Sequence, residues 1–433
     1  MSVINSSFGG GGGIKVNGQP MTVDAQSTVT NGDLGIIKKG LSLYKSLSVS
    51  LNVRTSNTVA CYPITETLLA IIYCVSGSSG SYNWNVAVAE LNTDGSLKNT
   101  GTPTTVRSTS REYESASITP ITNNTFIMYN EGRYAVWVSV STSSKLITAK
   151  TMSEANSHYD LTIQKIDESR VANFYHLSRN GTDTREISIY NYNSGTYSTP
   201  VVVETYSNSS YYAGYDSQAL SPIRNGIAIA ASKASEDLDN ISTRVIRFLG
   251  DNITVSSAKN NNYMAHGNEK TNTYIRPCAN LQATGINIAV FVGNDMYSNP
   301  TSSRDPLLCV PYSNSGNMQS IIRKEEVNDI QCVPIGENSI LVSCDRPSWK
   351  CKQLLFLDEE HIVEINDGTS FGSASYNPTI VYYEQAPYLT FARASSSTTV
   401  RVQLYRIGNK MIPTDKLACI STQSGTNDIN VLA

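Results

Sequence analysis

The side chains that could carry acid–base or metal chemistry are few and widely separated in this sequence. Two groups of adjacent carboxylates, at residues 325–326 and 358–360, could supply the paired acids of glycoside hydrolysis. The second group follows an apolar stretch, where a hairpin turn is expected, so we interpret these carboxylates as solvated turn residues. The histidines are too scattered to form a metal-binding motif. They are His158, His176, His266 and His361.

Other catalytic signatures are also missing. The sequence contains no phosphate-binding glycine loop and no Ser-x-Asp-x-Gly-x-Thr-Trp turn of the kind that sialidase-like enzymes repeat. The arginines, which such enzymes gather around a sugar carboxylate, stand singly along the chain. We therefore predict that the protein is not an enzyme and uses no cofactor, and we keep a glycan-cleaving hydrolase as an alternative.

A tyrosine-rich segment is the main candidate for ligand binding. Residues 205–216 combine tyrosine with serine, asparagine and glycine, the composition of adaptable recognition surfaces. Rigid aromatic rings beside small hydrogen-bonding groups suit a sugar, so we expect a glycan as the ligand. The alternative is an ordinary connector between repeats. The candidate binding residues are Tyr206, Tyr211, Tyr212 and Tyr215.

Composition argues against several classes of partner. The formal net charge is −3 and no block of Lys or Arg occurs, so the electrostatic footprint of a nucleic-acid-binding protein is missing. No apolar run approaches the roughly 18 residues of a membrane-spanning helix. The N-terminus lacks the basic and apolar regions of a secretory signal, so we expect synthesis and folding in a cytoplasm.

Several of the eight cysteines lie within apolar stretches, where a thiol packs as a small hydrophobic side chain. We therefore predict reduced core cysteines, in keeping with a cytoplasmic origin. Cys344 and Cys351 flank a short polar segment and leave open a zinc half-site or a disulfide across a hairpin.

An apolar strand, a short turn and a second apolar strand recur along the chain about seven times. Most copies are followed by another pair of strands with a polar turn such as Asp-Gly or Gly-Asn. The copy at residues 379–390 is the most divergent. The period of roughly 53–55 residues has the size of one propeller blade. Four copies carry a Pro-Ile pair, which begins at Pro63, Pro120, Pro222 and Pro334.

These repeats predict an all-β fold, a β-propeller of about seven four-stranded blades. A single blade cannot bury both of its apolar faces, whereas blades stacked around a ring cover one another. Helix signals are nearly absent. An array of β-sandwiches is the alternative, because sandwich strands also recur at short intervals.

The two ends of the chain are predicted to pair with each other. Residues 14–52 and 409–433 alternate short strands with turns, and neither has enough strands to be stable alone. We expect them to form a small β cap beside a propeller that spans residues 53–408. Residues 1–13 end in five glycines and are expected to form a flexible attachment segment.

Short motifs bracket the repeats at both ends. They comprise Asn17, Gly18, Gly32 and Asp33 near the start and Ala418, Gly425, Ile429 and Val431 near the end. This arrangement resembles virion proteins of tailed bacteriophages that infect Gram-positive, clostridia-like hosts. The resemblance implies a location on the virion and contact with other virion proteins through the N-terminus. The residues of that attachment would be Phe8, Gly9, Gly10, Gly11, Gly12 and Gly13.

The sequence and this resemblance together predict a tail-fibre or receptor-binding protein that attaches to a host-surface glycan through propeller loops. The resemblance also implies a homo-oligomer. One alternative is a structural decoration or baseplate protein with no receptor, and the glycan-cleaving hydrolase is the other.

Overall fold

The computed structural model describes most of the chain, and the structural statements below refer to that part. The described residues are 20–25, 29–31, 34–53, 59–76, 82–109, 117–129, 134–152, 158–179, 182–207, 218–233, 241–261, 273–283, 285–295, 306–319, 322–325, 331–344, 350–358, 361–370, 379–413, 419–421, 424–425 and 429–432.

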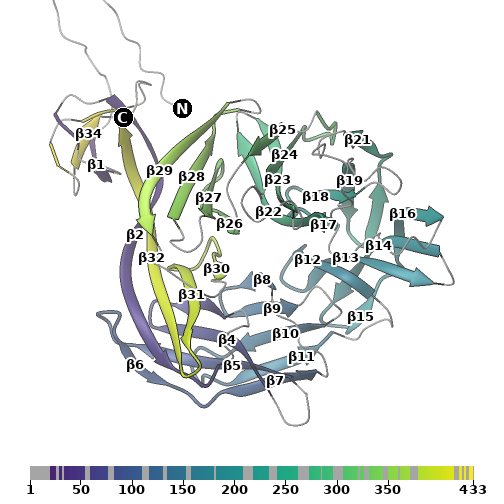
Figure 1. The fold of residues 1–433 in the computed structure, drawn as a ribbon, viewed down its shortest axis with the longest axis horizontal. Helices are drawn as coiled ribbons and strands as arrows, with labels where there is room; N and C mark the ends of the chain where they lie inside the picture. Colours follow the sequence, from purple (N-terminus) through teal and green to yellow (C-terminus); the bar gives the residue numbers. More distant parts are fainter. Residues whose placement is uncertain are drawn as a thin grey trace, which may run out of the picture. The chain divides into compact units, whose positions relative to one another are not determined.

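Six antiparallel sheets follow one another along the chain, and each has a core of four strands paired in sequence order (Figure 1). Blades 1 and 2 consist of β3 (Ala60–Thr65), β4 (Leu68–Ser76), β5 (Tyr82–Leu91) and β6 (Leu97–Thr100), then β8 (Ser117–Thr122), β9 (Thr125–Tyr129), β10 (Ala135–Val140) and β11 (Ile147–Thr151). Blades 3 and 4 consist of β12 (His158–Lys165), β13 (Arg170–Arg179), β14 (Thr182–Asn191) and β15 (Thr196–Tyr197), then β17 (Gln218–Leu220), β18 (Ile227–Lys233), β19 (Ile241–Leu249) and β20 (Asn252–Val255). Blades 5 and 6 consist of β22 (Thr273–Ala283), β23 (Ile286–Asp295), β24 (Pro306–Tyr312) and β25 (Ile322–Glu325), then β26 (Gln331–Pro334), β27 (Ser339–Cys344), β28 (Lys350–Phe356) and β29 (Ile362–Ser370).

Three short strands extend the outer edges of blades 1, 3 and 4. They pair with the third strand of their blade, and they are β7 (Thr104–Thr109), β16 (Val201–Ser207) and β21 (Lys259–Asn261). Strand β16 matters for the site described below, because it carries the first residues of the tyrosine-rich segment.

The seventh blade is built from both ends of the chain. Its strands are β30 (Thr379–Val381), β31 (Leu389–Ser396), β32 (Thr399–Pro413) and, from near the N-terminus, β2 (Leu34–Ser50). Strand β3 of blade 1 contacts β30 and β31, so the ring closes. The prediction of a seven-bladed propeller is confirmed, and the alternative of separate sandwiches is wrong.

The blades pack face to face, and this explains why the central strands are apolar on both sides. In β4, Leu69–Tyr73 are all buried, since one face of the strand packs on each neighbouring blade. Between blades 3 and 4 the core includes Phe174, Ile187, Leu220 and Ile246. Each blade thus covers its neighbour, as stacked repeats must.

The repeated Pro-Ile pair occupies the innermost strands. Pro63, Pro120 and Pro334 lie on β3, β8 and β26, each of which pairs with only one other strand of its sheet. Proline has no amide hydrogen to donate, so an edge strand tolerates it. The isoleucines that follow Pro63 and Pro120 are buried between blades.

Side chains from neighbouring blades bond the main-chain carbonyl groups along the innermost strands. These bonds run from Thr119 Oγ1 to Ile163 O at 2.7 Å, from Gln164 Nε2 to Leu220 O at 2.8 Å and from Asn280 Nδ2 to Pro222 O at 2.7 Å. Thr390 donates in the same way to the carbonyl oxygen of Cys61, which joins blade 7 to blade 1. The unpaired edge of each inner strand is thereby partly satisfied.

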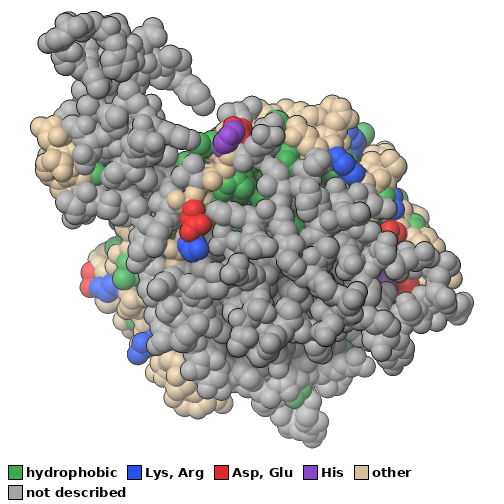
Figure 2. All heavy atoms as spheres, turned by 45° about the horizontal axis from the view of Figure 1, so that its top comes forward, with side chains coloured by type: hydrophobic (Ala, Val, Ile, Leu, Met, Phe, Trp, Pro, Cys, Tyr) green, Lys and Arg blue, Asp and Glu red, His purple; other side chains and the backbone are tan. Residues whose placement is uncertain are grey.

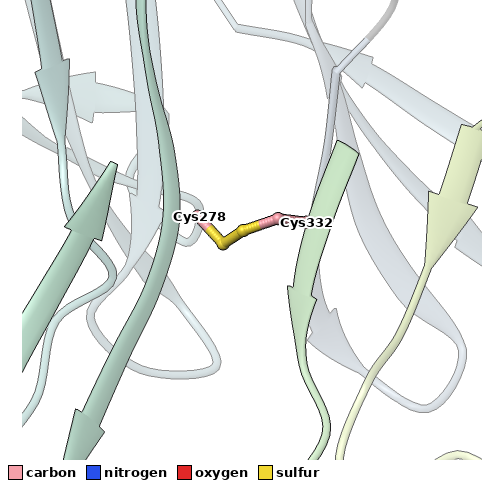
Figure 3. Close-up of a disulfide and its surroundings, with 2 residues drawn as sticks. All are labelled: Cys278 and Cys332. Carbon is pink, nitrogen blue, oxygen red and sulfur yellow. A yellow bond between two sulfur atoms is a disulfide. The ribbon is translucent and has the colours of Figure 1, made fainter. Parts of the chain in front are cut away.

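A disulfide corrects the prediction that the cysteines are reduced. Cys278 of β22 and Cys332 of β26 are bonded, with Cα atoms 5.5 Å apart, and they join the inner strands of blades 5 and 6 (Figure 3). Cys351 is buried and belongs to no disulfide, so the disulfide considered between it and Cys344 is not formed. Among the described residues, Cys61, Cys74 and Cys309 are also buried and outside any disulfide, as predicted for core cysteines.

The chain divides into two compact units, one formed by the two chain ends, Met1–Tyr44 with Tyr405–Ala433, and the other by Lys45–Leu404. The pairings of the chain-end unit run from β1 (Pro20–Ala25) to β34 (Ile429–Leu432), β33 (Cys419–Ser421), β2, β32 and back to β1. The five strands make a closed circuit, which leaves no strand edge open. The predicted pairing of the two termini in a small β cap is confirmed.

Charge is dispersed over the described surface. On the face shown in Figure 2, the basic and acidic side chains of the described residues stand singly or in small groups. No helix long and apolar enough to cross a membrane is found in the described part of the chain.

Candidate functional site

The sequence-predicted binding residues are only partly placed by the structure. The main chain of Tyr206 lies on β16, directly opposite Asp183 of β14. Tyr211, Tyr212 and Tyr215 lie outside the described residues. The predicted attachment residues, Phe8 and Gly9 to Gly13, also lie outside them.

A group of polar and charged side chains gathers between blades 3 and 4, and we call it the blade 3–4 polar cluster. It consists of His176, Asp183, Arg185, Glu204, Ser232, Ser242 and Arg244. Successive residues of a strand point to opposite faces. His176 therefore shares a face of β13 with Phe174, and Arg185 shares a face of β14 with Ile187, both of which pack against blade 4.

The cluster lies at one end of the two blades. Asp183 is the second residue of β14, and Ser232 is the last residue but one of β18. Strands β13, β16 and β18 finish at this same end, at Arg179, Ser207 and Lys233, and residues 180–181, 208–217 and 234–240 lie outside the described residues. Because Tyr206 lies opposite Asp183, the described part of the tyrosine-rich segment is next to the cluster in the sheet.

Glu204 is the centre of the charged contacts. Its Oε2 lies 2.9 Å from Arg185 Nη1 and accepts a hydrogen bond from Ser232 Oγ at 3.0 Å. Its Oε1 lies 3.7 Å from Arg244 Nη2. A buried guanidinium group needs such a partner, and the Arg185 side chain is only 4% exposed.

A histidine and a carboxylate form the second part of the cluster. His176 Nε2 lies 3.8 Å from Asp183 Oδ1, and both side chains are mostly buried. Burial lowers the pKa of His176, and the nearby Asp183 carboxylate opposes this shift only in part. The neutral imidazole is therefore favoured near neutral pH, and a neutral imidazole can accept a proton.

Several polar atoms of the cluster have no hydrogen-bond partner within the described part of the chain. These are Asp183 Oδ1, Ser242 Oγ and Arg244 Nε, all of them buried. Buried polar atoms are almost always satisfied, by protein, water or ligand. An acceptor, a hydroxyl group and a guanidinium donor left open in one interface therefore suit a polar ligand.

The carboxylates singled out in the sequence do not form a second site among the described residues. Asp358 lies in the exposed turn after β28, where it contacts His361 Nδ1 at 2.8 Å, and His361 is 67% exposed. This agrees with the interpretation of a solvated turn. The sequence also contains one Gly-x-Ser-x-Gly at residues 368–372, but its serine ends the outer strand β29 rather than a strand that leads into a helix.

Sequence reasoning missed the cluster because its members are distant in the chain. In the sequence His176 is one of four histidines too scattered to form a metal-binding motif, and Glu204 and Arg244 belong to no motif. The alternation of polar and apolar residues in 182–191 was the available signal, since it places two charged side chains on the apolar face of a strand.

Comparison with known proteins finds the fold but no family. No protein-family model matches the chain, and no curated protein sequence matches it. A solved structure of Penicillium chrysogenum alpha-L-arabinanase is 11% identical, with 65% of this chain and 89% of that chain covered and a TM-score of 0.37. Polysaccharide lyase Uly1 is 6% identical, with 82% and 91% covered and a TM-score of 0.47. An ulvan lyase of a new polysaccharide lyase family is 9% identical, with 83% and 96% covered and a TM-score of 0.46.

These comparisons correct the prediction that the protein is not an enzyme. The solved structures to which this propeller is similar are named as enzymes, so its architecture gives no ground for excluding catalysis. The dispersal of histidines and carboxylates in the sequence gives none either, because the fold brings His176, Asp183 and Glu204 into one buried cluster. At these levels of identity the similarities show the fold alone.

Proposed function

We propose that this propeller binds a polysaccharide at the end of blades 3 and 4 and cleaves it with the blade 3–4 polar cluster. The observation that carries the proposal is the buried pair of His176 and Asp183 in an interface that also holds two guanidinium groups. Burial lowers the pKa of His176, and a titratable group with a shifted pKa beside a charged partner is typical of active sites.

In this proposal His176 is the proton acceptor. Its neutral imidazole takes a proton from water or from a sugar carbon, and the carboxylate of Asp183 stabilises the imidazolium ion that forms. In hydrolysis the oxygen of the activated water would bond to the anomeric carbon as the glycosidic bond breaks, and the proton taken up by His176 would pass to the oxygen that leaves. Elimination would instead leave a carbon–carbon double bond in the sugar, and the proton taken from the sugar carbon would pass from His176 to the same oxygen.

The test is incubation of the full-length protein with a panel of polysaccharides. New reducing ends report either reaction, and the ultraviolet absorbance of an unsaturated sugar reports elimination alone. Removing a general base costs typically about 10²–10⁴-fold in rate, so we expect a loss of that size in His176→Gln.

The matched control is Glu186→Gln. Glu186 lies on the same strand as Asp183, but its carboxylate accepts a hydrogen bond from Tyr175 OH. Tyr175 packs in the core between blades 2 and 3, away from the interface that holds the cluster. This variant should keep the wild-type rate. Equal rates for His176→Gln and the wild-type protein would rule out the assigned role, and cleavage of no polysaccharide in the panel would overturn the proposal.

A second candidate function is attachment to a glycan on a host surface. It is favoured by the tyrosine-rich segment, which begins on the strand that carries Glu204. Alanine at Tyr206, Tyr211, Tyr212 and Tyr215 should then abolish adsorption to host cells. Location on a virion, contact with other virion proteins and homo-oligomerisation belong to this candidate, and immunolabelling of particles with sedimentation of the pure protein would test them.

A further inference from the structure

The two guanidinium groups of the cluster are held in different ways. The Arg185 side chain is 4% exposed and its Nη1 lies 2.9 Å from Glu204 Oε2, so Arg185 is paired closely with that carboxylate. Arg244 is 19% exposed, and its Nη2 approaches Glu204 only to 3.7 Å. Its Nη1 makes a long contact of 3.4 Å with the main-chain oxygen of Ser256. Arg244 therefore has N–H groups that remain available to a ligand.

The open donors of Arg244 lie on one edge of its guanidinium group. Nε is buried and has no hydrogen-bond partner in the described part of the chain, and Nη2 beside it makes only the long contact to Glu204. These two nitrogens form a fork whose parallel N–H bonds match the two oxygens of a carboxylate. A neutral sugar hydroxyl group can occupy only one branch of that fork.

Charge in the cluster also favours an anion at this position. Arg185 neutralises Glu204 at close range, and His176 lies beside Asp183, so the positive charge of Arg244 is the least compensated. A carboxylate at the fork would complete the hydrogen bonds of Arg244 Nε. The hydroxyl groups of the same sugar could donate to Asp183 Oδ1, which is buried and lacks a hydrogen-bond donor.

From this geometry we infer that the glycan is acidic and that Arg244 binds the carboxylate of a uronic acid unit. The inference rests on the proposed function, and it adds the class of sugar that the site selects. It also places Arg244 in contact with the ligand, whereas Arg185 and Glu204 stabilise the interface between blades 3 and 4.

The test compares acidic polymers with their own neutral forms. Binding of the full-length protein to polygalacturonate, alginate and hyaluronan is measured by calorimetry, each beside the polymer whose carboxyl groups have been reduced to alcohols. Hydrogen bonds to charged groups are the stronger kind, so we expect the reduced form to bind about tenfold or more weakly.

Two substitutions of Arg244 test whether this residue causes the preference for the acidic polymer. Arg244→Gln should abolish the preference for the acidic form, and Arg244→Lys should restore only part of it, because an ammonium group lacks the planar fork. Glu186→Gln should leave the preference unchanged. Thermal unfolding of each variant confirms that it is folded.

The outcomes separate this inference from the proposed function. Equal binding of acidic and reduced polymers, or binding of a neutral polysaccharide alone, overturns the acidic assignment and leaves glycan binding intact. An undiminished preference in Arg244→Gln overturns the role of Arg244. Failure of every polysaccharide to bind overturns the proposed function, and the inference with it.

Discussion

At the scale of single residues, this propeller buries charge where most blade interfaces are apolar. Arg185 lies between blades 3 and 4 with Glu204 as its partner. A buried charged group without a partner destabilises such an interface, so Arg185 and Glu204 are tolerated there only together. The atoms of Asp183 and Arg244 that lack hydrogen bonds distinguish the proposed ligand-binding part of the cluster from this pair.

Replacing Glu204 with alanine should therefore destabilise the protein strongly. The buried guanidinium group of Arg185 would lose the carboxylate that lies 2.9 Å from its Nη1, and breaking a buried pair costs about 3–5 kcal/mol. Urea unfolding measures the change. Replacing the pair together, Arg185→Met with Glu204→Leu, should recover much of the loss. A decrease below about 1 kcal/mol in Glu204→Ala would show that the charge is not buried.

The lowered pKa of His176 makes the stability of the protein depend on pH. The unfolded state binds a proton at this residue near pH 6.5, whereas the folded state binds it only at lower pH. The contribution of neutral His176 to the free energy of unfolding is present above pH 6.5 and is lost as the pH falls towards the folded-state pKa. Calorimetric unfolding between pH 8 and 5 should show a smaller loss in His176→Gln than in the wild type. Parallel curves for the two proteins would contradict a buried neutral histidine.

At the scale of elements, the innermost strands are the part of the fold that the sequence predicts best. The Pro-Ile pair marks three of these strands, because an edge strand tolerates a residue with no amide hydrogen. The sequence does not reveal that side chains such as Thr119 and Gln164 bond the carbonyl groups of the next inner strand. Their partners are about one repeat away, and only the closed ring brings them together.

The disulfide between β22 and β26 should add to stability. Cys278 and Cys332 are separated by 54 positions, and a crosslink that closes a loop of this size contributes about 4 kcal/mol through the unfolded state. Mass measurement of the denatured protein with and without reduction checks the bond. Cys278→Ser with Cys332→Ser should lower the unfolding temperature of the oxidised protein, whereas Cys74→Ser keeps the disulfide and should still unfold at a lower temperature after reduction. Free thiols at both Cys278 and Cys332 in the oxidised protein would refute the pairing.

At the scale of the whole molecule, β2 completes the last blade of the ring. This strand is the fourth strand of blade 7 and also belongs to the five-stranded circuit at the chain ends. The divergence of the seventh repeat follows from this construction, because the last blade takes its outer strand from a different part of the chain. The ends were predicted to pair, and β2 additionally completes the propeller.

Deleting residues 1–50 should therefore prevent stable folding. The deletion removes β1 and β2, which leaves the edge of β32 open and the terminal circuit broken. We expect aggregation or a broad, non-cooperative transition in circular dichroism and size-exclusion chromatography. Deleting residues 1–13 alone is the control and should leave unfolding unchanged. A soluble, cooperatively folded product of the longer deletion would show that the ring closes without β2.

The sequence by itself determined the strand content, the repeat and the pairing of the termini. Alternating apolar positions and turn residues act over a few neighbours in the chain, so they can be read locally. Only the tertiary structure decided that Cys278 meets Cys332 and that His176, Asp183, Glu204 and Arg244 share one interface. These meetings depend on which faces of separate blades come together around the ring, and no local pattern of residues encodes that.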